Sequence, residues 1–446
     1  MSAFLDEYAG YMARFGRPAR VELMLCDLNA VLRGKWLPGE DEAKLDAGGV
    51  RLPLSTYAPN IFGEEVEATG LGIVAGDPDG RIQPVPGTLK PVPWTAGHVA
   101  QVQVEMLDPD GEIPALSPRR QLSDMLARFH ARDLAPVIAT ELEFYLIRPR
   151  DAPSAPPMPP DFVAGAQNYD LEVLEKNAPI LDDILSAAQA QGIPTDTLIA
   201  EYGPGQFEVN FHHTDDVMFA ADMALWFRRL VRGVARKHGL EATFMAKPYA
   251  GFPGSGMHAH ISVVNADGRN IFDAGGPLSD TLKAAVGGVL DTMREMQAIF
   301  APHFNSYRRF QPGSFAPSAP DWGFDNRAAA VRLPETRGPG ARLEHRISGA
   351  DVNPYLAITA ILAGILHGLD TTPDLPAPLD DPAASPAAPL TYDWGQALDL
   401  FEASDFAADT FGAAYRDTYA LVRRDELEAL TSEISPIEFR TYLGRL

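Results

Sequence analysis

Apolar and polar residues alternate in four short stretches of the chain, and this period of two predicts β-strands with one apolar and one polar face. The stretches are residues 137–147, 206–211, 257–263 and 342–346. Their polar faces carry Glu141, Glu143, Gln206, Glu208, Asn210, His258, His260, Ser262, Arg342, Glu344 and Arg346. Because each strand must bury its apolar face, we expect a curved sheet with helices on that side and a charged concave side.

Apolar residues at helical spacing predict helices around these strands. The predicted helices cover residues 1–17, a segment that begins at Ser117-Pro118, residues 171–191, 216–238, 280–299 and 353–367, and the C-terminal part with a last cap at Ser435-Pro436. Residues 21–28 and 31–36 form a predicted hairpin, residues 98–106 a further strand, and residues 305–326 an aromatic-rich mobile flap. The turn at residues 108–111 marks a boundary. The sequence thus predicts an α+β chain with a mostly β domain at 1–110 and a second domain at 111–446.

Composition and charge restrict the possible partners. The chain has 446 residues, 46% of them hydrophobic and 22% charged, as in ordinary globular proteins. Its formal charge of −23 argues against a nucleic-acid or anionic-membrane partner, since either needs a basic surface. The single cysteine, Cys26, excludes an internal disulfide and fits a reducing compartment. With neither a secretion leader nor an apolar run of about 18 residues, the chain is expected to be cytoplasmic.

The polar strand faces and nearby arginines form a candidate metal and phosphate site. Taken alone, His258 and His260 would be a hydrogen-bonded pair on a half-exposed strand about as often as a functional site. Five carboxylates favour two or more divalent cations, and mostly oxygen ligation favours Mg²⁺ or Mn²⁺. Five arginines suit phosphate and carboxylate groups, as phosphoryl transfer requires. The full set is Glu141, Glu143, Glu201, Glu208, Glu344, His258, His260, Arg309, Arg327, Arg332, Arg342 and Arg346.

Seven short motifs occur in an order that resembles the glutamine synthetase family. They are E-L-E-F at 141–144, E-Y-G-P-G-Q-F-E at 201–208, K-P and G-S-G-M-H-A-H-I-S within 247–262, N-S-Y-R-R at 305–309, N-R at 326–327, R-L-E-H-R at 342–346 and N-P-Y-L at 353–356. The resemblance implies an N-terminal β-grasp domain and a catalytic domain of the glutamine synthetase type. It also implies active sites between neighbouring subunits of a ring, commonly in two stacked hexamers.

The resemblance further implies a role for each matched residue. One metal ion would be held by Glu143, Glu201 and Glu208, and the other by Glu141, His258 and Glu344. The glutamate substrate would contact Gly254, Arg309 through its α-carboxylate and Arg346 through its γ-carboxylate. ATP would contact His260, Ser262, Arg327, Arg332 and Arg342. The implied reaction transfers the γ-phosphoryl group of ATP to glutamate, after which an amine attacks γ-glutamyl phosphate.

The chain departs from the family's ammonia-using members at two positions. Those members carry an aspartate in an N-terminal F-D-G-S-S-type loop and a glutamate in the flap, and both help to bind and deprotonate ammonium. Here residues 52–60 contain no aspartate, and Phe315 stands where the glutamate is expected. Loss of both anions weakens the attraction for a small hydrated cation and favours an amine with a carbon tail. The aromatic residues available to cover that tail are Tyr57, Phe62, Phe315, Trp322 and Phe324.

The sequence therefore predicts an ATP-dependent glutamate–amine ligase that resembles γ-glutamylpolyamine and related synthetases. One alternative is an ammonia-dependent glutamine synthetase that uses other residues as the base. Another is a ring-forming scaffold without catalysis, which the intact metal and phosphate positions disfavour. The family's adenylylation tyrosine motif is not visible near residues 370–392, so we expect no control by that modification.

Overall fold

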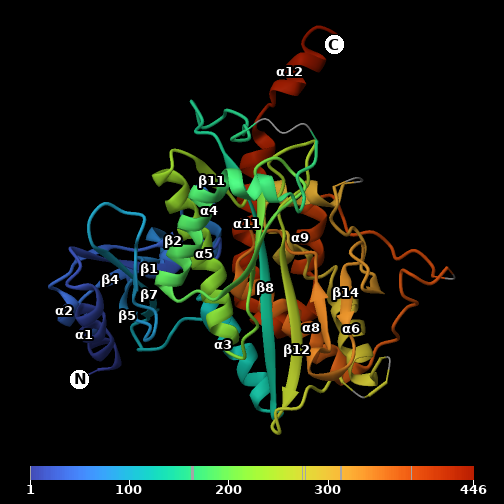
Figure 1. Cartoon of the computed structure of the whole chain (residues 1–446), viewed down its shortest axis with the longest axis horizontal. Coiled ribbons are helices and arrows are strands. Elements are labelled where there is room, and N and C mark those ends of the chain that lie inside the picture. The colour runs from blue at the N-terminus through green and yellow to red at the C-terminus, as the bar shows by residue number, and fades with distance from the viewer. Residues whose placement is uncertain (1, 162–164, 274, 277, 312–313, 383) are drawn as a thin grey trace.

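The computed structural model describes residues 2–161, 165–273, 275–276, 278–311, 314–382 and 384–446, and it contains two sheets, each beside its own hydrophobic core (Figure 1). The strands of the N-terminal sheet are β1 (Arg20–Cys26), β2 (Leu32–Arg33), β3 (Trp36–Pro38), β4 (Arg51–Pro53), β5 (Asp79–Pro84), β6 (Lys90–Pro91) and β7 (Val99–Leu107). At its centre β1 runs parallel to β7, and the other pairs are antiparallel. Helix α1 (Ala3–Phe15) packs Phe4 and Tyr8 onto this sheet, because residues four apart share one helix face.

The second sheet is larger and carries the alternating strands that the sequence predicts. Its strands are β8 (Leu134–Ile147), β9 (Thr195–Ala200), β10 (Gln206–Phe211), β11 (Glu241–Thr243), β12 (Met257–Asn265), β13 (Trp322–Phe324), β14 (Val331–Glu335) and β15 (Arg342–His345). They lie in the order β13-β14-β15-β12-β8-β10-β9, with β11 beside β8. All pairs are antiparallel except the short pair β13–β14. Strand β12 pairs with β8 over its whole length, so these two strands form the spine of the sheet.

Helices cover the apolar side of the second sheet. They include α3 (Pro118–His130), α4 (Leu171–Gln191), α5 (Val217–Lys237), α6 (Asp280–Thr292), α7 (Gln297–Phe300) and α8 (Pro354–Thr371). Of these, α3 and α5 pack directly on β8, and α8 packs against α3, α5 and α6. Among the described residues, one helix, α8, is long and apolar enough to span a membrane, and 78% of that stretch is buried inside the protein.

The remaining elements are short or C-terminal. They are α2 (Glu42–Asp46), α9 (Trp394–Glu402), α10 (Asp405–Phe411), α11 (Ala413–Ser432), α12 (Pro436–Tyr442) and the 3-10 helices Leu54–Tyr57, Glu67–Thr69, Ile73–Ala75, Phe304–Phe310 and Gly338–Gly340. Helix α12 projects from the body of the subunit at the C-terminal end of the chain (Figure 1).

Local sequence signals explain most element boundaries. Ser117 caps α3 by accepting a hydrogen bond from the Arg120 amide, and Gly192 ends α4 with φ of 72°, a conformation that glycine adopts without strain. The predicted helix 280–299 is divided into α6 and α7. The Thr292 hydroxyl bonds back to the Gly288 carbonyl near that break, an arrangement that bends helices.

The structure confirms the predicted α+β fold, and it differs from prediction around the flap. Residues 305–326 contain most of a 3-10 helix and strand β13, and the unpredicted strand β14 follows them. Two residues of this predicted flap, Pro312 and Gly313, lie outside the described residues.

Candidate active site

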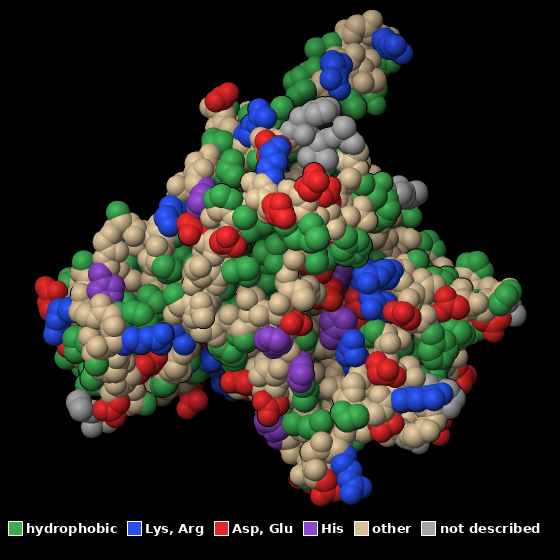
Figure 2. All heavy atoms as spheres, viewed as in Figure 1, with side chains coloured by type: hydrophobic (Ala, Val, Ile, Leu, Met, Phe, Trp, Pro, Cys, Tyr) green, Lys and Arg blue, Asp and Glu red, His purple; other side chains and the backbone are tan. Residues whose placement is uncertain are grey.

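The register of the second sheet brings the polar strand faces together. His258 lies opposite Glu141 in the β8–β12 pair, and Glu208 lies opposite Glu143 in the β8–β10 pair. In the β12–β15 pair, His260 lies opposite Glu344. Because directly opposite residues share one face of a sheet, the acidic and histidine side chains form one continuous surface. Figure 2 shows histidine, basic and acidic side chains gathered on the face over β8 and β12.

At the centre of this surface, one carboxylate contacts two imidazoles. The two oxygens of Glu141 lie 3.0 Å from His258 Nδ1 and 2.8 Å from His260 Nε2. Burial alone would raise the pKa of Glu141, but the hydrogen bonds to the two histidines outweigh it and hold that pKa well below its usual range. Glu141 therefore stays ionised and available as a ligand at neutral pH.

Beside Glu141 lies an acidic cluster formed by Glu143, Glu201 and Glu208, with Arg309, Arg327 and Arg346 lining the same cavity. One oxygen from each carboxylate falls within 4.8 Å of the others. Burial, and then the charge of Glu201, raise the pKa of Glu143 to about 8. Burial and the neighbouring charge of Glu141 raise the pKa of Glu208 well above its ordinary value. Such crowding of buried carboxylates is relieved by a divalent cation bound between them.

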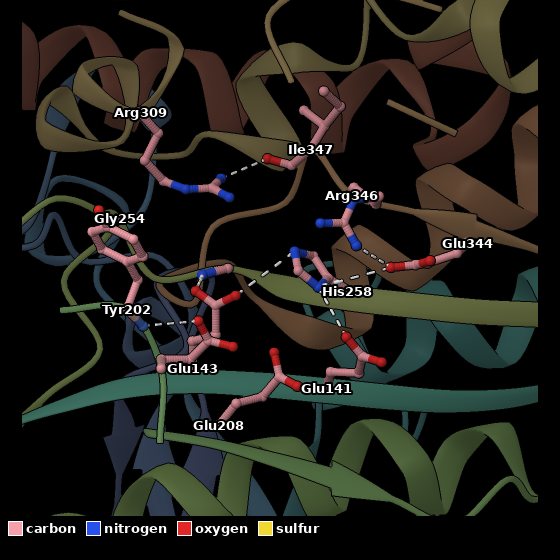
Figure 3. Close-up of polar contacts among 12 residues, drawn as sticks. Glu141, Glu143, Tyr202, Glu208, Gly254, His258, Arg309, Glu344, Arg346 and Ile347 are labelled. Atoms are coloured by element: carbon pink, nitrogen blue, oxygen red, sulfur yellow. Dashed lines mark hydrogen bonds and ion pairs between the residues drawn. The ribbon is translucent and has the colours of Figure 1, made fainter. Parts of the chain in front are cut away.

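Within the described residues, three groups of side chains could hold a metal ion, and they overlap. They are Glu143 with Glu201 and Glu208, Glu141 with Glu208 and His258, and Glu141 with His260 and Glu344. Each group offers at least two carboxylate oxygens, which fits Mg²⁺ or Mn²⁺. Arg332 and Arg346 both form ion pairs with the fully buried Glu344, so they hold this carboxylate in place. The close-up in Figure 3 shows Glu143, His258 and Arg346 directed toward the same space.

Two cavities meet at Glu141, which lines both. The larger one, of about 1190 Å³, is lined by His260, Ser262 and Arg342, together with His212 and His213. The smaller one, of about 450 Å³, is lined by Gly254, Arg309, Arg327, Arg346, Phe315, His258 and the acidic cluster. Two substrates, one bound in each cavity, would therefore have their reacting groups on either side of the Glu141 carboxylate.

Glycine is required where the loop before β12 passes the smaller cavity. A Cβ atom at Gly254 would lie 2.5 Å from the Ala246 carbonyl oxygen and 2.7 Å from Arg309 Cγ. The Gln206 side chain donates to the Gly254 carbonyl over 3.0 Å, and the Gly256 amide donates to Glu143 over 2.8 Å. Arg309 is buried and donates to the Ile347 carbonyl (Figure 3). Its side chain is therefore held between the backbone of Gly254 and the backbone of Ile347.

An aromatic pair lies at the smaller cavity. The rings of Phe315 and Tyr202 pack in a tilted arrangement, with centroids 5.0 Å apart and an interplanar angle of 35°. Phe315 is 69% exposed and has φ of 62°, a conformation that non-glycine residues seldom adopt. In the described part of the flap, residues 314–317 line the cavity, and none of them is acidic.

Several predicted site residues line neither cavity in the described structure, among them Tyr57, Phe62, Trp322, Phe324 and Arg332. Tyr57 is 1% exposed in the N-terminal core, where its hydroxyl donates to Glu105 and accepts from the Met106 amide, so its ring is not available to an amine. Arg332 lines neither cavity of the described structure and instead pairs with Asp325 and Glu344.

Sequence reasoning missed several cavity-lining residues. Tyr202 follows Glu201 directly in the E-Y-G-P-G-Q-F-E motif, and its ring contact with Phe315 reveals a role that the motif alone does not. Gln206 was placed on the acidic strand face without a function. His212 and His213 follow β10 immediately, and their position at the end of an acidic strand was the available signal.

Comparison with known proteins agrees with this geometry. The family model described as "Glutamine synthetase, catalytic domain" matches residues 115–442. The chain is 41% identical to γ-glutamylputrescine synthetase PuuA of Escherichia coli (strain K12), over 96% of this chain and 92% of that protein. It is 31% identical to a glutamate–isopropylamine ligase of a Pseudomonas species, over 95% and 94% of the two chains. The solved structure of a GmaS/ADP complex superposes with a TM-score of 0.85 and 29% identity, covering 98% and 99% of the two chains.

A curved antiparallel sheet with carboxylates, histidines and arginines between two cavities is the architecture of a metal- and nucleotide-dependent ligase. The chain belongs to the glutamine synthetase family and is, by that membership, an ATP-dependent ligase. This confirms the family that the sequence motifs indicate.

Proposed function

We propose that the protein joins the γ-carboxylate of glutamate to a primary amine with a carbon tail, a polyamine or a small alkylamine, at the expense of ATP. The observation that carries this proposal is the Phe315–Tyr202 pair at the smaller cavity, where ammonia-using relatives would place a carboxylate. An aromatic surface attracts a carbon tail by burial and a distal ammonium through its ring faces, whereas it offers little to ammonium itself. The similarity to synthetases named for putrescine and isopropylamine supports the same acceptor class.

In this proposal the two cavities divide the substrates. ATP occupies the larger cavity, with His260 and Arg342 toward its phosphates and Ser262 toward its base. Glutamate occupies the smaller one, where Arg309 pairs with its α-carboxylate and Arg346 with its γ-carboxylate. Arg327 also lines the smaller cavity and would neutralise the transferred phosphoryl group. Arg332, which lines neither cavity, keeps its proposed phosphate role only indirectly, by holding Glu344.

The acidic residues would bind two or more Mg²⁺ or Mn²⁺ ions, held by Glu143, Glu201 and Glu208 and by Glu141, His258 and Glu344, with His260 adjacent. Bound metal ions neutralise the phosphate and carboxylate charges and align them for in-line transfer. A γ-carboxylate oxygen attacks the γ-phosphorus and ADP leaves. The amine nitrogen then attacks the γ-carbonyl carbon, phosphate departs, and the amine releases a proton.

The acceptor class is tested with an amine panel. Phosphate release is followed with ATP, Mg²⁺ and glutamate while ammonium, methylamine, isopropylamine, ethanolamine, putrescine and spermidine are varied. We expect the best organic amine to exceed ammonium in kcat/KM by at least about tenfold, because burial of two or more methylene groups contributes about 1.5 kcal/mol. Equal values for ammonium and the best amine would identify an ammonia-dependent glutamine synthetase instead.

A separate variant tests whether the site is catalytic at all. Glu143→Ala removes a carboxylate from the acidic cluster and should abolish phosphate release with every amine. The matched control is Glu241→Ala, at a partly exposed carboxylate that begins β11, pairs with Arg150 and lines neither cavity. If Glu143→Ala behaves like this control, the chain is a ring-forming scaffold and the ligase proposal is wrong.

The proposed assembly is a homo-oligomer of two stacked hexameric rings in the cytoplasm, with active sites between subunits. Helix α12 supports association, because it projects from the subunit and exposes Ile437, Phe439, Tyr442 and Leu443. Such an apolar surface needs a partner. Sedimentation of the full chain and of a chain ending at residue 433 should show a twelve-subunit particle and a smaller one, respectively. Identical sedimentation would contradict a role of α12 in assembly.

A further inference from the structure

A third cavity, of about 440 Å³, lies between α5 and the N-terminal hairpin. None of the described residues that line it lines either of the two cavities described above. Its basic wall consists of Arg228, Arg229, Arg232 and Arg236, all from α5. Arg229 pairs with Glu22, so Arg228, Arg232 and Arg236 face a cavity whose lining, among the described residues, contains one carboxylate, that of Asp351. In a chain with a formal charge of −23, this is a local excess of positive charge.

The spacing of three of these arginines places them in one row. Arg228, Arg232 and Arg236 are four residues apart, so their side chains lie on the same face of α5. Like charges at this spacing destabilise a helix unless an anion lies between them. Among the described residues, neither Arg232 nor Arg236 has an ion pair with a carboxylate, and the Arg232 guanidinium lies over the ring of Phe244, 5.4 Å from its centroid. Arg228 feels the charge of Asp351, which also lines the cavity, so the positive charge without a carboxylate partner lies at Arg232 and Arg236.

Arg228 is the buried member of the row and is only partly satisfied. It is 6% exposed, and its Nη1 donates to the carbonyls of Ala350 and Val352 over 3.2 and 2.9 Å. Its Nη2 has no hydrogen-bond partner in the described structure. Burial, and then the charge of Arg232, lower the pKa of Arg228 to about 10. A buried guanidinium with a free donor marks a place where an acceptor fits.

We propose that this cavity binds a small anion with two or more negative charges, a polycarboxylate or a phosphate ester. Guanidinium groups bind both carboxylates and phosphates through paired hydrogen bonds, and three of them in a row match a ligand with several charges. The volume admits a small molecule, and apolar residues such as Leu32 and Met245 line the remaining wall.

Binding in this cavity would reach the smaller of the two catalytic cavities through a short contact path. Asp351 lines the arginine cavity and accepts a hydrogen bond of 2.6 Å from Ser306. Ser306 belongs to the 3-10 helix Phe304–Phe310, which also carries Arg309. An anion that pairs with Arg228 would compete with Asp351 for positive charge, so the cavity is connected by contacts to the helix that carries Arg309.

The test measures binding to the metal-free full-length protein by calorimetry, with citrate as the polycarboxylate probe and inorganic pyrophosphate as the phosphate probe. The variants are Arg232→Glu, the milder Arg232→Gln, and the matched control Lys237→Glu. Lys237 is on the same helix, does not line the cavity, and pairs with Asp183. We expect at least one probe to bind wild type and Lys237→Glu alike, and to bind Arg232→Glu at least about tenfold more weakly, as loss of one charge-assisted pair predicts. Arg232→Gln should fall between them.

Equal binding of both probes to all variants would overturn the proposal, because the anion then sits on the arginines of the catalytic cavities. The proposal would also be overturned if Arg232→Glu sediments differently from wild type but binds citrate and pyrophosphate with unchanged affinity. That result would mean that a second copy of the chain covers the arginine row. The binding measurement needs no turnover, so its outcome is independent of the proposed ligase activity. The probe that binds distinguishes carboxylate from phosphate ligands.

Discussion

Divalent metal binding should release at least one proton from the acidic cluster at neutral pH. The pKa of Glu143 is raised to about 8 by burial and by Glu201, so in the metal-free protein this carboxyl is mostly protonated at pH 7. A metal ion binds the carboxylate form, and below pH 8 the ion that binds Glu143 therefore displaces this proton. Between pH 6 and pH 7 the apparent Kd for Mg²⁺ should fall about tenfold through Glu143 alone.

The same carboxyl makes the metal-free fold less stable as the pH rises. It titrates near 4.5 in the unfolded chain and near 8 in the fold, so between these values the folded state keeps a proton that the unfolded state has lost. Raising the pH within this window favours the unfolded state by about 1.4 kcal/mol per pH unit, or about 3 kcal/mol between pH 4.5 and pH 7. Bound Mg²⁺ removes this penalty, because it replaces the proton as the counter-charge.

Calorimetric titration with MgCl₂ at pH 6, 7 and 8, in buffers of different ionisation enthalpy, counts the released protons directly. The control is Glu143→Gln, which keeps the shape of the side chain but cannot ionise. In EDTA this variant should have a higher Tm than wild type at pH 8, and the difference should shrink toward pH 5. Proton release of zero at pH 6 and 7, or equal pH dependence of Tm in the two proteins, would refute the assigned pKa.

Three further substitutions have expected outcomes. Gly254→Ala should raise the KM for glutamate at least about tenfold and leave the KM for ATP nearly unchanged, because the added methyl group displaces the buried Arg309 side chain. Initial rates measured while each substrate is varied in turn test this expectation. Phe315→Ala should lower kcat/KM for the best organic amine about tenfold with little effect on ammonium, and an equal loss for both would exclude an amine-specific role. Arg423→Ala leaves the carboxylate of Glu426 buried without its cation and should lower the free energy of unfolding by about 3 to 5 kcal/mol. Arg424→Ala removes one partner of a partly exposed ion pair and should lower the free energy of unfolding by about 1 kcal/mol or less. Urea unfolding of both variants measures these differences.

The charged sheet face could be predicted from the sequence because strand alternation is a local property. Glu141, Glu143 and His258 needed only the period of two to be placed on polar faces, and antiparallel pairing then brought those faces together. Cap residues such as Ser117 and Asn353 fixed helix starts for the same local reason, since each binds an amide two or three residues away.

Positions that depend on distant partners could not be predicted. The position of Tyr57 in the loop 52–60 predicts a ring that covers the tail of the amine. In the structure its hydroxyl instead bonds Glu105 and the Met106 amide, nearly fifty residues away, inside the N-terminal core. Arg332 was assigned to ATP, but strand β14 was not predicted, and its pairing with β15 places Arg332 directly opposite Glu344. For both residues, a contact with a segment distant in sequence sets the position of the side chain, and the local motif does not reveal that contact.

The division between strand-borne and loop-borne residues has a consequence for protein engineering. Apart from Glu201, which directly precedes Tyr202, the carboxylates and histidines around Glu141 belong to the hydrogen-bonded spine β8–β12 and its neighbours, whereas Phe315 and Tyr202 belong to loops. A combinatorial library confined to residues 314–317 and 202 would therefore sample new acceptor amines on an unchanged reaction centre. Most clones in such a library should retain ATP turnover, so selection for growth on an unusual amine as nitrogen source becomes practical.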